Sequence, residues 1–241
     1  MIEIIPAIDI IDGRCVRLSK GDYNSCKEYG EPLDMAREFA DAGARRLHLV
    51  DLDGAKESEP RNLATLEKIA ALGALKIEWG GGIKSGDALR SVLGSGADYA
   101  IIGSVAATSP ALFEEWLEEF GPERMIFGAD TLEGRIRIKG WLESAQTPLI
   151  ELLERFGSRG LSQVICTDIS RDGMLSGPNT GMYTALQASF PQMTFTVSGG
   201  ISSMEDIRSL NDLGLRRVIV GKAFYEGKIS LEELRKWWQN A

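Results

Sequence analysis

The sequence predicts a (β/α)8 barrel that is built from two similar half-barrels and forms a single domain over residues 1–241. Short apolar runs alternate with amphipathic helical patterns along the whole chain, which indicates parallel strands joined by helices. No linker, low-complexity segment or change of composition divides it. The sequence also repeats itself: "TVSGGISSMEDIRSL" (196–210) resembles "EWGGGIKSGDALRSV" (78–92), about half the chain earlier. The repeat predicts two copies of a four-strand unit.

In the first half, four runs are expected to be strands buried on both faces of a sheet, because each is short and continuously apolar. They are 2–8, 46–50, 75–79 and 99–103. The helices expected after them are 32–42, 62–72, 86–95 and 110–120. The last of these begins with Ser109-Pro110, a cap followed by the proline that favours a first helical position. A glycine that can take the left-handed conformation follows each helix, at Gly43, Gly73, Gly96 and Gly121.

The second half repeats this alternation. The expected strands are 124–129, 163–167, 194–198 and 217–221, and the expected helices are 148–157, 180–189, 204–213 and 230–238. Ser203 with Asp206 resembles a capping box, and Ser230 with Glu233 matches one. Gly214 follows the helix 204–213 as a further left-handed end. A hairpin excursion is expected over 131–140, between the fifth strand and its helix.

The composition argues against several classes of protein. A net charge of −8 and a pI near 4.9 disfavour a nucleic-acid-binding surface. No apolar run is long enough to span a membrane, and the N-terminus lacks the basic region of a signal peptide. Three cysteines without CxxC spacing and one histidine, His48, fit a cytoplasmic protein that holds no metal. We expect His48, inside a strand, to be structural, and the protein to be a monomer, because no exposed apolar stripe stands out.

Glycine-rich turns follow four of the expected strands, in two equivalent pairs. Glycine allows a backbone to approach a ligand closely, and the start of the next helix offers free N–H groups, so such turns are typical phosphate sites. They would also suit a tight turn alone, but two copies with equal internal spacing favour function. We therefore expect two phosphate sites half a barrel apart, and an elongated ligand with a phosphate at each end. The residues concerned are Gly81, Gly82, Gly103 and Ser104 in one half, and Gly199, Gly200, Gly221 and Lys222 in the other.

Two carboxylates are expected to face each other between these sites. Asp9 ends the first strand and Asp130 ends the fifth, which lies opposite in an eight-stranded barrel. Facing carboxylates suit acid–base catalysis, in which one takes a proton and the other gives one. A helix cap or a salt bridge is the usual role of a single strand-end aspartate, and the paired placement argues against it for these two.

Several further polar and aromatic residues are open to two interpretations. Asp51 and Asp168 occupy equivalent positions in the repeat, so either can be structural. Asp172 lies in a turn-like "RDG", where an Asx-turn is as reasonable as catalysis. Thr167 ends a strand and can bind substrate or its own backbone. Trp141 can stack on a ring or cover the barrel mouth.

Long motifs along nearly the whole chain resemble one family. "IPAIDIIDGRCVRLSKGDY", "LHLVDLDGAK", "GGGIK", "IIGS", "GWLE", "CTDISRDGMLSGPN", "SGGI" and "VIVGKAFYEGK" are similar to the histidine-biosynthesis isomerases that act on phosphoribosylformimino-AICAR-phosphate. This resemblance implies a (β/α)8 barrel, a bisphosphorylated ribotide substrate, and an Amadori rearrangement of an aminoaldose to an aminoketose without metal or cofactor.

The resemblance also implies roles for individual residues. Asp9 is implied as the general base that removes the C2′ proton, and Asp130 as the general acid that opens the ribose ring. Thr167 and Asp172 are implied as supporting polar residues near the sugar. The implied substrate- and phosphate-binding positions are the glycine-rich turns together with Arg17, Gly21, Trp141, Gly177 and Ser198. Lys84 departs from the family, whose members often have Arg there; lysine keeps the charge but not the planar fork.

Three alternatives are weighed against this interpretation. The cyclase of the same pathway shares the double phosphate site, but its first loop resembles "DGRVVKG", whereas this chain has "DGRCVRLSKGDY". A dual-substrate isomerase would also accept phosphoribosylanthranilate. A non-catalytic phosphosugar-binding barrel would have no need of Asp9 and Asp130.

Overall fold

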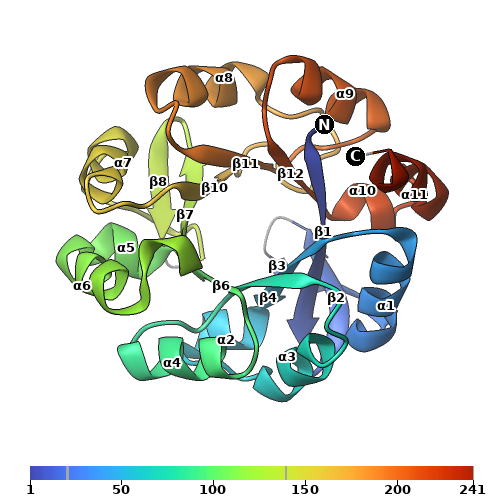
Figure 1. Cartoon of the computed structure of the whole chain (residues 1–241), viewed down its shortest axis with the longest axis horizontal. Helices are drawn as coiled ribbons and strands as arrows, with labels where there is room; N and C mark the ends of the chain where they lie inside the picture. Colours follow the sequence, from blue (N-terminus) through green and yellow to red (C-terminus); the bar gives the residue numbers. More distant parts are fainter. Residues whose placement is uncertain (20–21, 139, 241) are drawn as a thin grey trace.

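Eight parallel strands form a closed barrel with helices around it (Figure 1). The structure is a computed structural model that describes residues 1–19, 22–138 and 140–240, and numbers of strands and helices refer to those residues. Pairing of Glu3 in the first strand with Arg217 in the last closes the barrel, which confirms the predicted fold. Around the barrel, the strands are β1 (Glu3–Ile11), β4 (Arg46–Asp51), β5 (Lys76–Gly80), β6 (Tyr99–Ile102), β7 (Met125–Leu132), β10 (Gln163–Asp168), β11 (Thr194–Ser198) and β12 (Arg217–Val220).

The helices outside the barrel lie where their start and stop signals predict. The capping boxes at Ser203 and Ser230 are both formed, and the glycines after the predicted helices all adopt positive φ. None of the helices in the described part of the chain is long and apolar enough to cross a membrane. The predicted eight are α1 (Pro32–Ala42), α3 (Leu63–Ala70), α4 (Gly86–Gly94), α6 (Pro110–Phe120), α7 (Leu149–Gly157), α8 (Thr180–Ser189), α9 (Met204–Asp212) and α11 (Leu231–Gln239).

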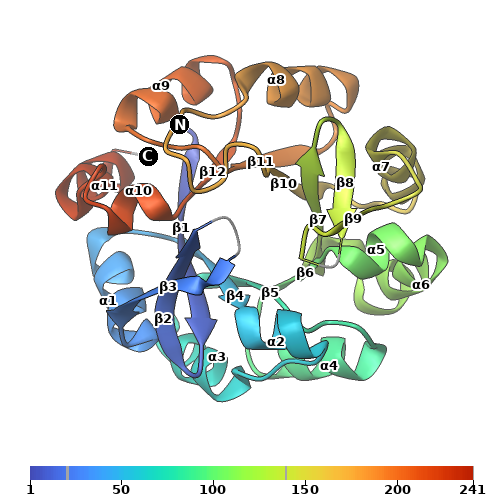
Figure 2. The ribbon, with the colours of Figure 1, turned by 180° about the vertical axis from the view of Figure 1, so that it is seen from behind.

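The structure adds elements that the apolar pattern does not predict. A hairpin of β2 (Arg14–Ser19) and β3 (Asp22–Gly30) stands over one end of the barrel (Figure 2). Its strands carry many polar residues, so they lack the apolar signal of a barrel strand. The expected excursion after β7 is a hairpin with β8 (Arg135–Ile138), followed by β9 (Glu143–Ser144). Four short helical segments fill loops: α2 (Leu52–Glu57), α5 (Ser104–Thr108), η1 (Pro122–Arg124) and α10 (Lys222–Tyr225).

Apolar side chains pack on both sides of the barrel wall. The larger core lies between the strands and the helices and includes Phe39, Trp79 and Phe156. A smaller cluster fills the interior of the barrel with Ile5, Ala7, Ile126, Ile165 and Ile219. The barrel is therefore packed through its middle, and its two ends are separate environments.

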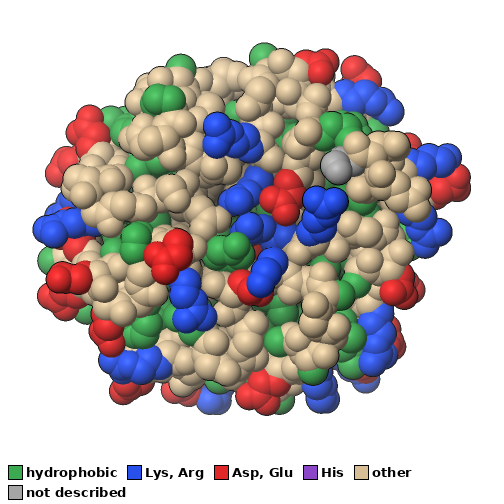
Figure 3. Space-filling model, in the orientation of Figure 1, with side chains coloured by type: hydrophobic (Ala, Val, Ile, Leu, Met, Phe, Trp, Pro, Cys, Tyr) green, Lys and Arg blue, Asp and Glu red, His purple; other side chains and the backbone are tan. Residues whose placement is uncertain are grey.

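A buried ion network, which we call the floor network, lies at the end where the strands begin. The Glu78 side chain is 1% exposed and holds two partners: its Oε1 lies 2.9 Å from His48 Nδ1, and its Oε2 accepts from Arg46 Nη1 at 3.2 Å. The Arg46 guanidinium also lies 4.3 Å from the centre of the Tyr99 ring. Charged side chains gather at the centre of this face (Figure 3). His48 is thus part of a structural network, in agreement with the role expected for it.

Candidate active site

The carboxyl ends of the strands hold the two aspartates singled out from the sequence. Asp9 lies near the end of β1 and Asp130 near the end of β7. These strands are four positions apart in either direction around the barrel, so the two residues come from opposite walls. The β2–β3 hairpin and the β8–β9 segment stand on this same face (Figure 2). The predicted opposed placement is what the structure shows.

Asp9 forms an ion pair with an arginine from the β2–β3 hairpin. Arg17 Nη1 donates to Asp9 Oδ2 at 2.5 Å, and the two side chains are only 16% and 13% exposed. Burial by itself would lower the pKa of Arg17, but the nearby carboxylates of Asp9 and Asp172 outweigh it and raise that pKa. The Arg17 guanidinium therefore stays charged beside Asp9, and the charge of Asp172 adds to this. It also packs on Gly221, where a Cβ would lie 2.5 Å from Arg17 Nη2.

Asp172 lies on this face, in the lining of the same pocket as Arg17 and Lys222. Burial raises its pKa above the ordinary value, and the charges of Asp9 and Asp130 add to this, while Arg17 and Lys222 oppose it. The neighbouring turn is organised by Asp168, which accepts hydrogen bonds from the backbone N and the hydroxyl of Ser170. The turn thus has another aspartate as its side-chain acceptor, and the functional role of Asp172 stays a prediction.

Asp172→Asn is expected to stabilise the protein at neutral pH. A carboxyl whose pKa is raised by folding keeps its proton more tightly in the folded state, so stability is lost as pH rises from the ordinary Asp value, about 3.9, through the raised one. Asparagine does not titrate, so the variant does not lose this stability as pH rises. Thermal unfolding of both proteins at several pH values checks it: the variant should have the higher Tm at pH 7, and its advantage should shrink toward pH 4. A variant with a lower Tm at pH 7 would contradict the expectation.

Asp130 is held by the tryptophan of the β8–β9 segment. The Trp141 indole Nε1 donates to Asp130 Oδ2 at 2.8 Å. Thr167 lies beside Asp130 because the two residues pair across β7 and β10. The Thr167 side chain is mostly buried, and its backbone oxygen accepts from the hydroxyl of Thr131 at 3.1 Å. The structure thus brings Asp130, Trp141 and Thr167 together on one wall.

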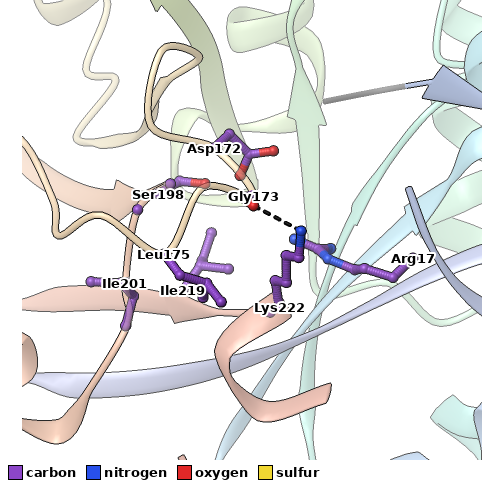
Figure 4. A pocket seen from close by; sticks show the side chains of 11 residues that line it. Arg17, Asp172, Gly173, Leu175, Ser198, Ile201, Ile219 and Lys222 are labelled. Carbon is purple, nitrogen blue, oxygen red and sulfur yellow. Dashed lines mark hydrogen bonds between the residues drawn. The ribbon is translucent and has the colours of Figure 1, made fainter. Parts of the chain in front are cut away.

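The glycine-rich turn of the second half lines a pocket between β11, β12 and the loop after β10 (Figure 4). Lys222, at the start of α10, donates from Nζ to the backbone oxygen of Gly173 at 2.9 Å, and Arg17 approaches the same space from the other side. Ser198, Gly199 and Gly200 form another part of the lining. Two cations and a glycine-rich backbone therefore converge on one small pocket, which suits an anion.

The glycines of both turns are required by the backbone itself. Gly82 has φ of 78°, and a Cβ there would lie 2.5 Å from the backbone of Glu59 and Pro60. Gly200 has φ of 87°, and a Cβ would lie 2.4 Å from the oxygen of Gly177, whose backbone N donates to Gly200 O. Both turns thus need glycine for steric reasons alone, and the phosphate sites at these turns stay a prediction.

Each half of the barrel has one lysine and one serine at its two glycine-containing turns. The residue that is lysine at the first turn of one half is serine at the first turn of the other, and the reverse holds at the second turn. In the first half Lys84 follows Gly-Gly-Ile and its Nζ donates to Ser104, which follows Gly103. In the second half Ser202 follows Gly-Gly-Ile, and Lys222 follows Gly221. Burial lowers the pKa of the Lys84 ammonium. The arrangement gives each turn one cation.

The equivalent aspartates Asp51 and Asp168 hold loops together. Asp51 accepts from the backbone N of Gly54 at 2.8 Å and from Asn62 Nδ2 at 2.7 Å. Asp168 in the same way accepts from Asn179 Nδ2 at 2.8 Å. The Asp–Asn pair therefore occurs once in each half, and both aspartates have the structural role that the repeat left open.

Gly21 lies outside the described residues. Within them, no cluster of three or more His, Cys, Asp or Glu side chains could hold a metal ion. Arg137 is a residue that sequence reasoning missed: it donates to the backbone oxygen of Trp141. Its only sequence signal is a charge in an alternating strand, which does not distinguish it from its neighbour Arg135.

Comparison with known proteins gives the family. A profile described as histidine biosynthesis protein matches residues 3–230. The chain belongs to this family. Its members include a protein of Cytophaga hutchinsonii that is 47% identical over 238 residues, which cover 98% of this chain and 99% of the relative. A Phocaeicola vulgatus protein is 48% identical over 238 residues, 98% of this chain and 100% of the relative. A Bacteroides thetaiotaomicron protein is 49% identical over 236 residues, which cover 98% of this chain and 99% of the relative.

These three family members carry the same name. Each is called 1-(5-phosphoribosyl)-5-((5-phosphoribosylamino)methylideneamino) imidazole-4-carboxamide isomerase. The matches extend along almost the entire length of both chains, so they include every element that contributes to the face described above.

Proposed function

We propose that this protein is an isomerase of histidine biosynthesis that converts phosphoribosylformimino-AICAR-phosphate, an aminoaldose, into its aminoketose. The observation that carries the proposal is the pair of aspartates on opposite walls, each held by a side chain from a separate hairpin or loop, between two lysine-bearing glycine turns. The full-length similarity to proteins named as this isomerase supports it.

The proposed chemistry begins with two proton transfers. Asp130, as general acid, gives a proton to the ring oxygen of the ribose, and the ring opens to a protonated imine at C1′. Asp9, as general base, takes the proton from the adjacent carbon, C2′, and the resulting enolamine becomes the aminoketose when C1′ gains a proton and the C2′ hydroxyl loses one. Asp172 and Thr167 line the space near the sugar. The glycine-rich turns, with Lys84 and Lys222, bind the two phosphates; both transfers need no metal or cofactor.

The substrate assay tests this proposal directly. The purified protein should convert phosphoribosylformimino-AICAR-phosphate to the aminoketose in an absorbance assay, and should turn over phosphoribosylanthranilate negligibly. Absence of the first conversion would overturn the proposal. Efficient use of both substrates would make it a dual-substrate isomerase. We propose further that it acts as a monomer in the cytoplasm, on this small molecule and without nucleic acid.

Removing either lysine is expected to weaken substrate binding. A hydrogen bond to a charged group contributes about 1.5–3 kcal/mol, so Lys84→Ala and Lys222→Ala should each raise KM about 10–100-fold. Lys222 also holds the loop at Gly173, so its loss should lower kcat as well. Steady-state kinetics with exposed Lys228→Ala as control measures this. An unchanged KM in either variant would remove that lysine from the phosphate site.

Exhaustive chelation is expected to leave turnover unchanged, because the proposed reaction consists only of proton transfers between substrate and carboxylates. The measurement is kcat before and after prolonged treatment with EDTA and desalting. A loss of activity that one divalent ion restores would show that a metal takes part.

A further inference from the structure

Arg137 donates hydrogen bonds both to the turn that carries Trp141 and to the strand that follows it. From β8, its Nε and Nη2 donate to the backbone oxygen of Trp141 at 3.0 and 2.7 Å. Its Nη1 donates to Ser144 Oγ in β9 at 2.9 Å, and the two residues also pair across the strands. One planar guanidinium therefore makes a two-pronged, charge-assisted contact with a single carbonyl while it is anchored to the facing strand.

The carbonyl that Arg137 holds belongs to a residue in an unfavourable backbone conformation. Trp141 has φ of 71°, in the left-handed region. For a residue with a bulky side chain this costs on the order of 1–2 kcal/mol, so it persists only where surrounding contacts impose it. The two hydrogen bonds from Arg137 are such contacts, because they fix the peptide that follows Trp141.

The consequence of this conformation is the direction of the indole. It turns back toward β7, where Nε1 donates to Asp130 Oδ2 at 2.8 Å. The β8 strand that carries Arg137 is itself paired with β7, through Thr131 with Ile136. Hydrogen bonds thus join Arg137 to the backbone of Trp141, and the Trp141 indole to the Asp130 carboxylate, along the segment from β7 to β9.

We propose that Arg137 is a positioning residue, which orients the Asp130 carboxylate by holding Trp141 in its left-handed conformation. The inference rests on the proposed function only in the role of Asp130; the effect of Arg137 on Trp141 stands apart from it. Arg137 itself does not touch the reacting atoms. Loss of the guanidinium releases the Trp141 peptide, the indole leaves Asp130, and the carboxylate samples orientations that do not face the ring oxygen.

The test uses Arg137→Met in the full-length protein, with Arg135→Met as its matched control. Arg135 lies two residues away on β8 and is exposed, so the control removes the same charge and leaves the turn intact. The indole N–H resonance of Trp141, assigned through Trp141→Phe, is followed by NMR. In Arg137→Met it should move to the position of a solvent-exposed indole and exchange faster with water, and in Arg135→Met it should stay. An unmoved resonance in Arg137→Met would overturn the proposal.

Kinetics provide the second measurement. Misplacement of a catalytic group by about 1 Å can cost 10²-fold, so kcat of Arg137→Met should fall about 10–100-fold, with a much smaller change in KM. Trp141→Phe should lower kcat similarly, and the double variant should be little worse than either, because both changes cut the same chain. Additive losses would show that Arg137 acts by another route. If the resonance moves while Asp130→Asn retains full turnover, the proposed role of Asp130 fails and the positioning of Trp141 stands.

Discussion

Asp9→Asn is expected to lose nearly all turnover while it still binds substrate. Abstraction of a proton from carbon is the harder of the two transfers, since the carbon acid is weak even beside a protonated imine. Asparagine keeps the size of the side chain and can still meet Arg17 through its oxygen, but it cannot accept the proton. General acid–base catalysis commonly contributes about 10²–10⁴-fold, so kcat should fall by at least that range, with KM changed little.

Asp130→Asn provides the comparison for this experiment, since it removes the proposed acid from the opposite wall. It should also be impaired in kcat more than in KM. If Asp9→Asn retained more than about a tenth of the wild-type kcat, far above the range for a lost general base, the base would have to be reassigned. Asp172 would then be the next candidate, because its carboxyl lies close enough to Asp9 and Asp130 for their charges to raise its pKa.

Glu78→Leu is expected to destabilise the fold strongly without altering the face that holds Asp9 and Asp130. It leaves Arg46, whose side chain is 7% exposed, without its buried carboxylate partner, and a buried ion pair broken on one side costs about 3–5 kcal/mol. For a protein of this size the Tm should fall by roughly 6–20 °C. Thermal unfolding monitored by circular dichroism measures it.

The double variant Glu78→Leu/Arg46→Met separates a missing partner from a packing defect. Removal of both charges should recover much of the lost Tm, because replacement of a whole buried pair by apolar groups is often neutral or stabilising. A double variant as unstable as Glu78→Leu would show that the cavity, rather than the unpaired guanidinium, causes the loss. At 25 °C both variants should keep the kcat and KM of the parent.

The barrel and the two opposed aspartates are predictable from the sequence because they depend on regular spacing. Apolar runs alternate with capped helices, so strand ends are predicted to within three residues, and an aspartate near such an end is expected on the face where the strands end. Asp9 and Asp130 are found in this way. The repeat also predicts that Gly82 and Gly200 occupy equivalent positions in the two halves. This prediction does not depend on the conformation of the loops.

Loop interactions escape this reasoning, because they depend on backbone conformations that spacing does not encode. Asp51 ends β4 and Asp172 lies in the loop after β10. The Asp51 carboxylate accepts hydrogen bonds from N–H groups of its own loop, whereas Asp172 is surrounded by the charges of Asp9, Arg17 and Lys222. The left-handed backbone of Trp141 belongs to a residue type that rarely adopts it, so no propensity predicts the contact with Arg137.

The apolar layer in the middle of the barrel, with Ile5, Ile126, Ile165 and Ile219, separates the floor network from the face that holds Asp9 and Asp130. Natural selection can therefore act on the two ends almost independently. Substitutions among the charged partners of Glu78 change stability at one end, whereas substitutions in the loops on the other side of the isoleucines change what that face can bind. One scaffold can thus acquire heat tolerance and new specificity by separate routes.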